Sequence, residues 1–69
     1  MTATYKLTEI VGTSPTSFAE AVREGVKRAS KTIRHIGWFE VVEQRGLVKE
    51  GNVAEFQVTM KIGFKLEDQ

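Results

Sequence analysis

Residues 53–66 read VAEFQVTMKIGFKL, and the prediction of the fold begins with their pattern. Apolar side chains alternate with polar or small ones, so that one set holds Phe56, Val58, Met60, Ile62, Phe64 and Leu66 and the other holds Gln57, Thr59, Lys61, Gly63 and Lys65. Because successive side chains of a strand point to opposite faces, this alternation predicts a long strand with one apolar and one polar face. We expect the apolar face to pack against a helix.

A hairpin turn precedes this strand. Residues 49–52, KEGN, separate it from a second β-rich run at residues 38–48, and the Gly-Asn pair favours a tight connection. A three-residue loop places Arg45 directly opposite Gln57, whereas a two-residue loop places Gly46 there. Either register brings Arg45 near Gln57.

The second β-rich run alternates less cleanly. Phe39 and Val41 share one parity, while Val42 shares the other with Trp38. A β-bulge, or burial of both faces, would explain the mixed pattern. The pattern therefore does not define one register around Trp38.

Upstream of the hairpin, a helical pattern begins at Ser17. Apolar or small residues recur at steps of three and four, namely Phe18, Val22, Gly25, Val26, Ala29, Ile33 and Ile36. Ser17 and Glu20 have the spacing of a capping box, in which the hydroxyl and the carboxylate each satisfy a backbone donor, and Gly37 would end the helix. Glycine inside a helix costs about 0.5–1 kcal/mol relative to alanine, so Gly25 indicates that another backbone passes close by.

A shorter strand opens the chain. Residues 4–11, TYKLTEIV, are rich in β-branched and aromatic types, and the turn-forming residues 12–15, GTSP, follow them. The element order is therefore β-α-β-β, an α+β fold in one domain over residues 1–69. One helix covers only part of such a sheet, and the uncovered part needs another subunit.

The small size of the chain also points to self-association. With 69 residues, no cysteine and one histidine, it has no disulfide and no thiolate or multi-histidine metal site to stabilise it. Burial of apolar area contributes about 25 cal/mol per Å², while ordering costs roughly 1.5 kcal/mol per residue, and in small domains the two nearly cancel. We therefore expect an assembly of identical subunits without a bound metal.

Charge and hydropathy argue against two classes of partner. The net charge of +1 provides no strong field toward nucleic acid or an anionic membrane. No basic leader precedes an apolar run, and no stretch approaches the ~20 apolar residues that span a bilayer. We expect a cytoplasmic protein that binds neither nucleic acid nor membrane.

The motifs of common enzyme classes are missing. The sequence has no plausible Ser-His-Asp or Cys-His set, no phosphate loop and no dinucleotide fingerprint. The segment Gly12-Thr13-Ser14 lies where a phosphate loop would, but it lacks the lysine and flanking glycines, so we interpret it as a turn. His35, at the expected helix end, is interpreted as structural. These absences favour a binding protein over an enzyme.

Basic side chains form a stripe on the predicted helix. Its members are Arg23, Lys27, Lys31 and Arg34, with Arg28 beside them. Glu24 can pair with Lys27 and Arg28, which favours a solvated, salt-bridged face. A phosphate-bearing or nucleic-acid partner is the alternative, and it predicts strong salt dependence of binding.

Trp38 is the one tryptophan, and it follows the glycine expected to end the helix. It is either a core or interface residue, or a platform on which a flat aromatic ligand stacks for about 0.5–1.5 kcal/mol beyond area burial. Gln57, in the middle of the polar strand face, is either solvent-facing or offers a carbonyl and an amide to a heterocycle.

Across nearly its whole length, the sequence resembles a dodecin. The likeness rests on TYKLTEIVGTSP at residues 4–15, a helix from Ser17, GWFEV at 37–41, RG at 45–46, FQVTMK at 56–61, GF at 63–64 and LED at 66–68. The resemblance implies a β-α-β-β subunit whose three-stranded antiparallel sheet partly wraps its helix, assembled into a hollow dodecamer. It also implies binding of flavins and their breakdown products, such as lumichrome, rather than flavin-dependent catalysis.

The same resemblance implies roles for individual residues. Trp38 would stack on the isoalloxazine of riboflavin or FMN, and a symmetry mate would close the pocket around a pair of flavins. Gln57 would hydrogen-bond the pyrimidine edge, and Arg45 and Lys65 would lie nearer the ribityl and phosphate end. Lys6 and Arg28 are candidates for the phosphates of coenzyme A, which some dodecins bind.

These roles predict that the protein stores and sequesters flavin and quenches its excited state. The alternative is a small oligomeric flavin-dependent oxidoreductase, for which Arg45, Lys65 and Glu43 are the ionisable candidates near the ring. A phosphate- or coenzyme A-binding module is a further alternative.

Overall fold

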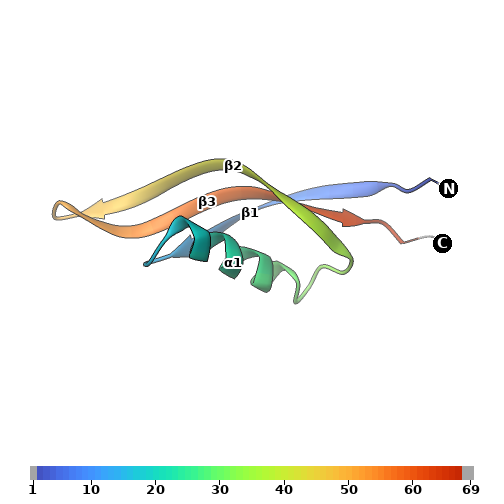
Figure 1. Cartoon of the computed structure of the whole chain (residues 1–69), viewed down its shortest axis with the longest axis horizontal. Helices are drawn as coiled ribbons and strands as arrows, with labels where there is room; N and C mark the ends of the chain where they lie inside the picture. Colours follow the sequence, from blue (N-terminus) through green and yellow to red (C-terminus); the bar gives the residue numbers. More distant parts are fainter. Residues whose placement is uncertain (1, 68–69) are drawn as a thin grey trace.

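Three strands and one helix follow one another in the predicted order (Figure 1). The computed structural model describes residues 2–67, so Asp68 of the dodecin-like C-terminal motif lies outside the described part. The elements are β1 (Tyr5–Ser14), α1 (Phe18–Ala29), β2 (Ile36–Lys49) and β3 (Asn52–Lys65). The sheet has the order β1-β3-β2 with both pairs antiparallel, so the longest apolar pattern of the sequence forms the central strand.

The core lies between one face of β3 and the helix. Val58, Met60 and Ile62 are fully buried there, as the alternation predicts, and they meet Ala21 and Ala29 of α1. The partly buried side chains around this core are Ile10, Val22, Val26, Ile33 and Ile36. The helix packs on β1 and β3 and leaves β2 uncovered (Figure 1).

Two glycines allow the helix to lie directly on the sheet. A Cβ atom on Gly25 would lie 2.7 Å from the Met60 Cε and 3.4 Å from the Gly12 Cα, and one on Gly12 would lie 2.2 Å from the backbone oxygen of Ala21. The close backbone approach predicted at Gly25 is therefore confirmed. Gly12, in contrast, does not form the predicted turn, because β1 continues to Ser14 and uses Gly12 as a contact point for the helix.

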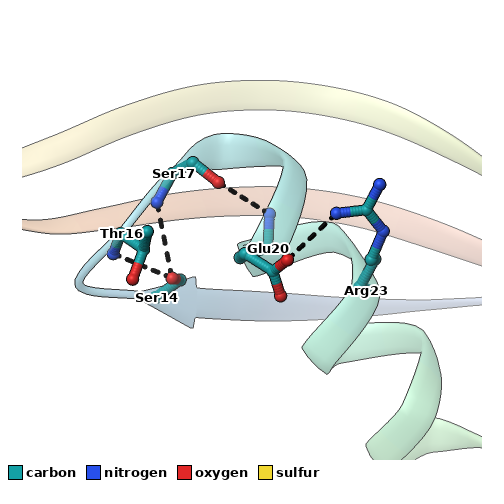
Figure 2. Close-up of polar contacts among 5 residues, drawn as sticks. All are labelled: Ser14, Thr16, Ser17, Glu20 and Arg23. Atoms are coloured by element: carbon teal, nitrogen blue, oxygen red, sulfur yellow. Dashed lines mark hydrogen bonds and ion pairs between the residues drawn. The ribbon is translucent and has the colours of Figure 1, made fainter.

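The start of the helix follows the prediction in part (Figure 2). The Ser17 hydroxyl accepts a hydrogen bond of 3.0 Å from the backbone N–H of Glu20. The Glu20 carboxylate does not return to Ser17, because it pairs with Arg23 at 3.0 Å instead. The backbone N–H of Ser17 donates to the hydroxyl of the buried Ser14, at 3.5 Å. The helix therefore has the predicted cap residue without the reciprocal half of a capping box.

The predicted end of the helix is wrong. Helix α1 ends at Ala29, and β2 has begun by Ile36, so Gly37 belongs to a strand. Ile33 and Ile36 do reach the core, but from the connection and from β2. Apolar spacing alone could not separate these cases, and the β-branched residues after Ser30 lower helix propensity. The residue with left-handed backbone here is His35, at φ 63°.

The hairpin resolves the alternative registers in an unexpected way. Its loop holds two residues, Glu50 and Gly51, whose φ values of 51° and 79° suit a type I′ turn. The Gly-Asn pair is thus not the centre of the loop. Beyond this loop the register shifts between the pairs Val48–Val53 and Leu47–Glu55, where β3 has one extra residue. Because of this β-bulge, Arg45 lies opposite Gln57.

A β-bulge, one of the two explanations that the sequence allowed, accounts for the irregular alternation of β2. The register shifts between Val41 and Glu43, which leaves Val42 as an extra residue and reverses the parity of the strand beyond it. A second shift lies between Ile36 and Trp38.

The protomer leaves many apolar side chains uncovered. On β2 the exposed fractions include 47% for Phe39 and 69% for Val48. The molecule measures 53 × 20 × 14 Å along its principal axes, so it is a thin, long body with a core on one side only. The expectation that one helix covers only part of the sheet is confirmed. None of the helices in the described part is long and apolar enough to cross a membrane.

Candidate ligand-binding site

The four residues expected to contact a flavin share one face of the sheet. Trp38 pairs with Gly63, Arg45 with Gln57, and Tyr5 with Lys65, and directly opposed residues of antiparallel strands point to the same side. The β3 members of these pairs all belong to the polar set of its alternating side chains. The face that carries Trp38, Arg45, Gln57 and Lys65 is therefore the one opposite the helix, and we call it the open face.

Trp38 is held on the open face by all three strands. Its indole covers the Cα of Gly63, where an added Cβ would lie only 2.3 Å from the Trp38 Cε2. Its ring meets that of Tyr5 on β1 edge-on, with centroids 5.3 Å apart and 68° between the planes. Its Nε1–H donates to Glu40 Oε2 at 3.0 Å. Despite these contacts the residue stays 38% exposed, so the indole is both fixed and accessible.

Arg45 and Gln57 form a polar cluster further along the same face. The Arg45 Nε–H donates to the Gln57 Oε1 at 2.8 Å, and the Arg45 Nη1 group donates to Glu43 at 3.0 Å and to Thr59 at 2.9 Å. The Gln57 Nε2 group donates to Glu55 at 2.9 Å. Arg45 thus fixes which end of the Gln57 amide is the carbonyl, and one lone pair and one N–H of that amide remain for a ligand.

Trp38 and the residues that contact it, Tyr5, Glu40 and Gly63, form what we call the aromatic group. In one protomer this group and the polar cluster are well separated. Gly63, beneath Trp38, and Gln57 lie six residues apart on β3. At about 3.3 Å per residue, the two positions are about 20 Å apart along the strand. That span exceeds a three-ring heterocycle, so Trp38 and Gln57 of one chain do not contact the same ligand ring.

Lys65 lies at the aromatic end of the open face. It pairs with Tyr5 and follows Gly63 by two residues, so its exposed ammonium group is a neighbour of Trp38 rather than of Gln57. The expectation that Arg45 and Lys65 lie at one end of a ligand therefore requires residues from different copies of the chain.

Lys6 and Arg28 lie elsewhere. Lys6 pairs with Phe64, on the parity that faces the helix side. Arg28, in the last turn of α1, lines a groove of about 390 Å³ with Glu24 and residues 10–13, and Lys6 does not line that groove. The protomer does not bring these two candidates into one site.

The predicted basic stripe on the helix is broken. Arg23 pairs with Glu20 within α1, whereas Lys31 and Arg34 lie beyond the end of the helix. Arg34 lies 3.8 Å from a carboxylate oxygen of Glu67. The interpretation of a solvated, salt-bridged surface stands for Arg23, which pairs with Glu20. The predicted pairs of Glu24 with Lys27 and Arg28 are not among the ion pairs of residues 2–67.

His35 makes structural contacts, but from the connection after α1 and not from the predicted helix end. Its Nε2 lies 2.7 Å from Glu67 Oε2, and its backbone oxygen accepts the Lys65 N–H at 3.2 Å, so it ties the end of β3 to the connection after α1. The hydrogen bond from His35, followed by the charge of Arg34, lowers the pKa of the Glu67 carboxyl below its ordinary value of 4.5.

Three residues of the aromatic group escaped sequence reasoning: Tyr5, Glu40 and Gly63. Gly63 carried a usable signal, because glycine inside a strand marks a site where another group approaches closely. Tyr5 carried none, since its contact with Trp38 depends on the sheet order and register. Glu40 shares a face with Trp38 by strand alternation alone, but nothing in the sequence showed that its carboxylate bonds the indole. In residues 2–67 no group of three or more His, Cys, Asp or Glu side chains is placed to hold a metal ion.

Comparison with known proteins agrees with this fold. The dodecin family model matches residues 4–67. A dodecin from Thermus thermophilus is 47% identical over 64 residues, which cover 93% of each chain. A calcium dodecin from Mycobacterium tuberculosis is 34% identical over 62 residues, which cover 90% of this chain and 87% of the relative. The solved dodecin from Streptomyces davaonensis superposes with a TM-score of 0.95 at 50% identity, over 99% of this chain and 100% of that one. The chain belongs to the dodecin family.

Proposed function

We propose that this protein is a non-enzymatic flavin store that stacks riboflavin or FMN against Trp38. The observation that carries the proposal is Trp38 itself, a residue that stays 38% exposed although three strands hold its indole in place. An aromatic side chain that is ordered but uncovered on a sheet face is suited to stack on a planar ring. An isoalloxazine ring system has the size and flatness that this surface accepts.

The binding site is completed by a second copy of the chain. A single open face can cover only one side of a flat ligand. The apolar side chains of Tyr5 and Leu7 beside Trp38, and of Val11 further along the same face, are exposed in the protomer. Two open faces brought together would place a pair of flavins between two indoles. Burial of this surface also supports a closed homo-oligomer, for which we propose the hollow dodecamer.

Gln57 recognises the pyrimidine edge of the flavin. That edge presents an N–H between two carbonyls, and the free lone pair and free N–H of the Gln57 amide match it. Because Gln57 is about 20 Å from the Trp38 of its own chain, it contacts a flavin stacked on the Trp38 of another copy. Hydrogen bonding then selects the ring, and stacking supplies most of the contact area.

Phosphate contacts are secondary. Lys65, beside the aromatic group, provides a point charge without the bidentate fork of arginine, so FMN and riboflavin should bind with similar affinity. Lys6 and Arg28 lie away from the open face, so any coenzyme A that they bind would occupy a site separate from the flavin.

Stacking would protect both the flavin and the cell from light. In a stacked pair, an electron passes rapidly from the indole to the excited ring and returns, so excitation is lost as heat and no net oxidation occurs. The bound flavin therefore loses its fluorescence. Sequestration in a closed particle keeps free flavin low.

A fluorescence titration tests the proposal. Riboflavin and FMN are titrated with wild-type protein, with Trp38→Phe and with Trp38→Leu, and the particle size of each variant is measured in parallel. We expect nearly complete quenching by wild type, weaker binding by Trp38→Phe and little by Trp38→Leu. Full flavin emission at saturating wild-type protein would rule the proposal out.

Two further assays address other ligands and activities. Steady-state NAD(P)H oxidation with bound FMN separates storage from the oxidoreductase alternative, in which Glu43, Arg45 or Lys65 would act near the ring. Calorimetric titration with Ca²⁺ tests whether the property in the name of the calcium dodecin relative extends to this chain.

A further inference from the structure

Glu40 lies next to the indole with its carboxylate on the ring nitrogen. Trp38 and Glu40 are two residues apart on β2, so their side chains stand side by side on the open face. The Nε1–H···Oε2 distance of 3.0 Å makes this the polar contact of the indole. We propose that Glu40 is the positioning residue of the flavin site, in that it fixes the rotamer in which Trp38 presents its ring. This inference rests on the proposed flavin-binding function.

The indole requires such a restraint because its support is nearly featureless. Gly63 offers only bare backbone beneath the ring, and the edge of Tyr5 contacts it without a directional bond. A side chain on an exposed strand face has three staggered χ1 wells available. A hydrogen bond to the single N–H of the indole selects one of them, because only one rotamer places Nε1 at the Glu40 carboxylate.

The expected gain follows from population arithmetic. If all three wells were equally populated, about one third of the rings would be ready to stack, and the apparent dissociation constant would rise about threefold. In a site closed by two indoles, loss of both restraints would raise it about ninefold. Glu40 therefore acts on affinity through Trp38 and does not itself contact the ligand.

Glu9 provides a matched control. On β3, Lys61 pairs with Glu40 on one side and with Glu9 on the other, so the two carboxylates occupy equivalent places on the open face. Both are exposed and carry the same charge, but only Glu40 is hydrogen-bonded to Trp38. Glu9→Ala removes a charge from the same row of the sheet and leaves the hydrogen bond between Trp38 and Glu40 in place.

The first experiment needs no ligand. Because the chain has one tryptophan, the indole N–H of the protein labelled with ¹⁵N gives one resonance per protomer environment. We expect Glu40→Ala to shift this resonance upfield and to speed its exchange with water. Glu40→Gln, which keeps an acceptor, should retain most of the wild-type shift, and Glu9→Ala should leave it unchanged.

The second experiment measures riboflavin affinity for the same variants. We expect Glu40→Ala to bind about threefold to ninefold more weakly, Glu40→Gln to recover most of the loss, and Glu9→Ala to match wild type. Equal losses for Glu40→Ala and Glu9→Ala would show a general charge effect and overturn the positioning role.

The two experiments separate the two proposals. An indole resonance that is unchanged in Glu40→Ala overturns the positioning role whether or not flavin binds. If Glu40→Ala shifts the indole resonance as expected but the wild-type protein binds no riboflavin, the flavin function is overturned. The hydrogen bond from Trp38 to Glu40 is then still upheld.

Discussion

The two faces of β3 differ in almost every respect. On the helix side, Val58, Met60 and Ile62 are fully buried and form the core of the protomer. On the open face the alternate residues support an exposed indole at Gly63 and a hydrogen-bonded amide at Gln57. A single alternating strand thus stabilises the subunit with one face and leaves the other uncovered, and this is the face on which we propose that flavin and a second copy bind. Changes on the two faces should therefore separate stability from binding.

The largest effect on stability is expected from Met60→Ala. Met60 is fully buried, and its Cε lies where the two glycine contacts bring helix and sheet together. Removal of a buried side chain of this size costs about 2–5 kcal/mol of unfolding free energy. Lys61→Ala, one residue along and on the open face, should change it by less than about 0.5 kcal/mol. Chemical denaturation measures both, and equal losses would contradict the division between the faces.

Gly63→Ala should have the largest effect on binding. The new Cβ would meet the indole at 2.3 Å, so Trp38 must leave its position and riboflavin affinity should fall at least about tenfold. Gly12→Ala is the matched change on the other face, where the Cβ meets the Ala21 carbonyl at 2.2 Å. That variant should lose about 1–3 kcal/mol of stability through overpacking. Unaltered riboflavin binding by Gly63→Ala would contradict the assignment of Trp38.

A smaller loss of affinity is expected from Arg45→Met, because it frees the Gln57 amide to rotate. Loss of one hydrogen bond of about 1 kcal/mol corresponds to about fivefold weaker binding. Since Arg45 is bound to Gln57, Glu43 and Thr59, riboflavin and FMN should weaken alike. A loss confined to FMN would instead identify Arg45 as a phosphate ligand.

The smallest effect should appear at the exposed pair of His35 and Glu67. Because the folded pKa of Glu67 lies below its ordinary value of 4.5, its contribution to stability is present above that pH and is lost as the pH falls through the folded pKa. The difference in thermal midpoint between wild type and Glu67→Gln should therefore shrink on acidification below about 4.5. A difference that stays constant across this range would contradict the pairing.

Sequence reasoning located the faces of the sheet better than the ends of its elements. Alternation along β3 is a property of the strand itself, so the placement of Gln57 and Met60 on opposite faces could be predicted. The end of the helix could not, because Ile33 reaches the same core from non-helical backbone. The pairing of Arg45 with Gln57 was only one of two alternatives, since it depends on a bulge that no local pattern indicated.

The candidate site was predictable only as a set of single residues. Trp38 and Gln57 were identified by type, but their separation of about 20 Å became visible only once the register was known. Tyr5 joins the site from the far edge of the sheet because Gly63 leaves the space between them open. Such contacts depend on tertiary structure and leave no periodic signal.

Sedimentation velocity followed at the visible absorbance of riboflavin tests most directly whether assembly and ligand site are one structure. If they are, flavin sediments with a large closed oligomer, at a ratio of one flavin per Trp38. Flavin that does not sediment, or that sediments with a single subunit, would contradict the proposal that assembly and ligand site are one structure.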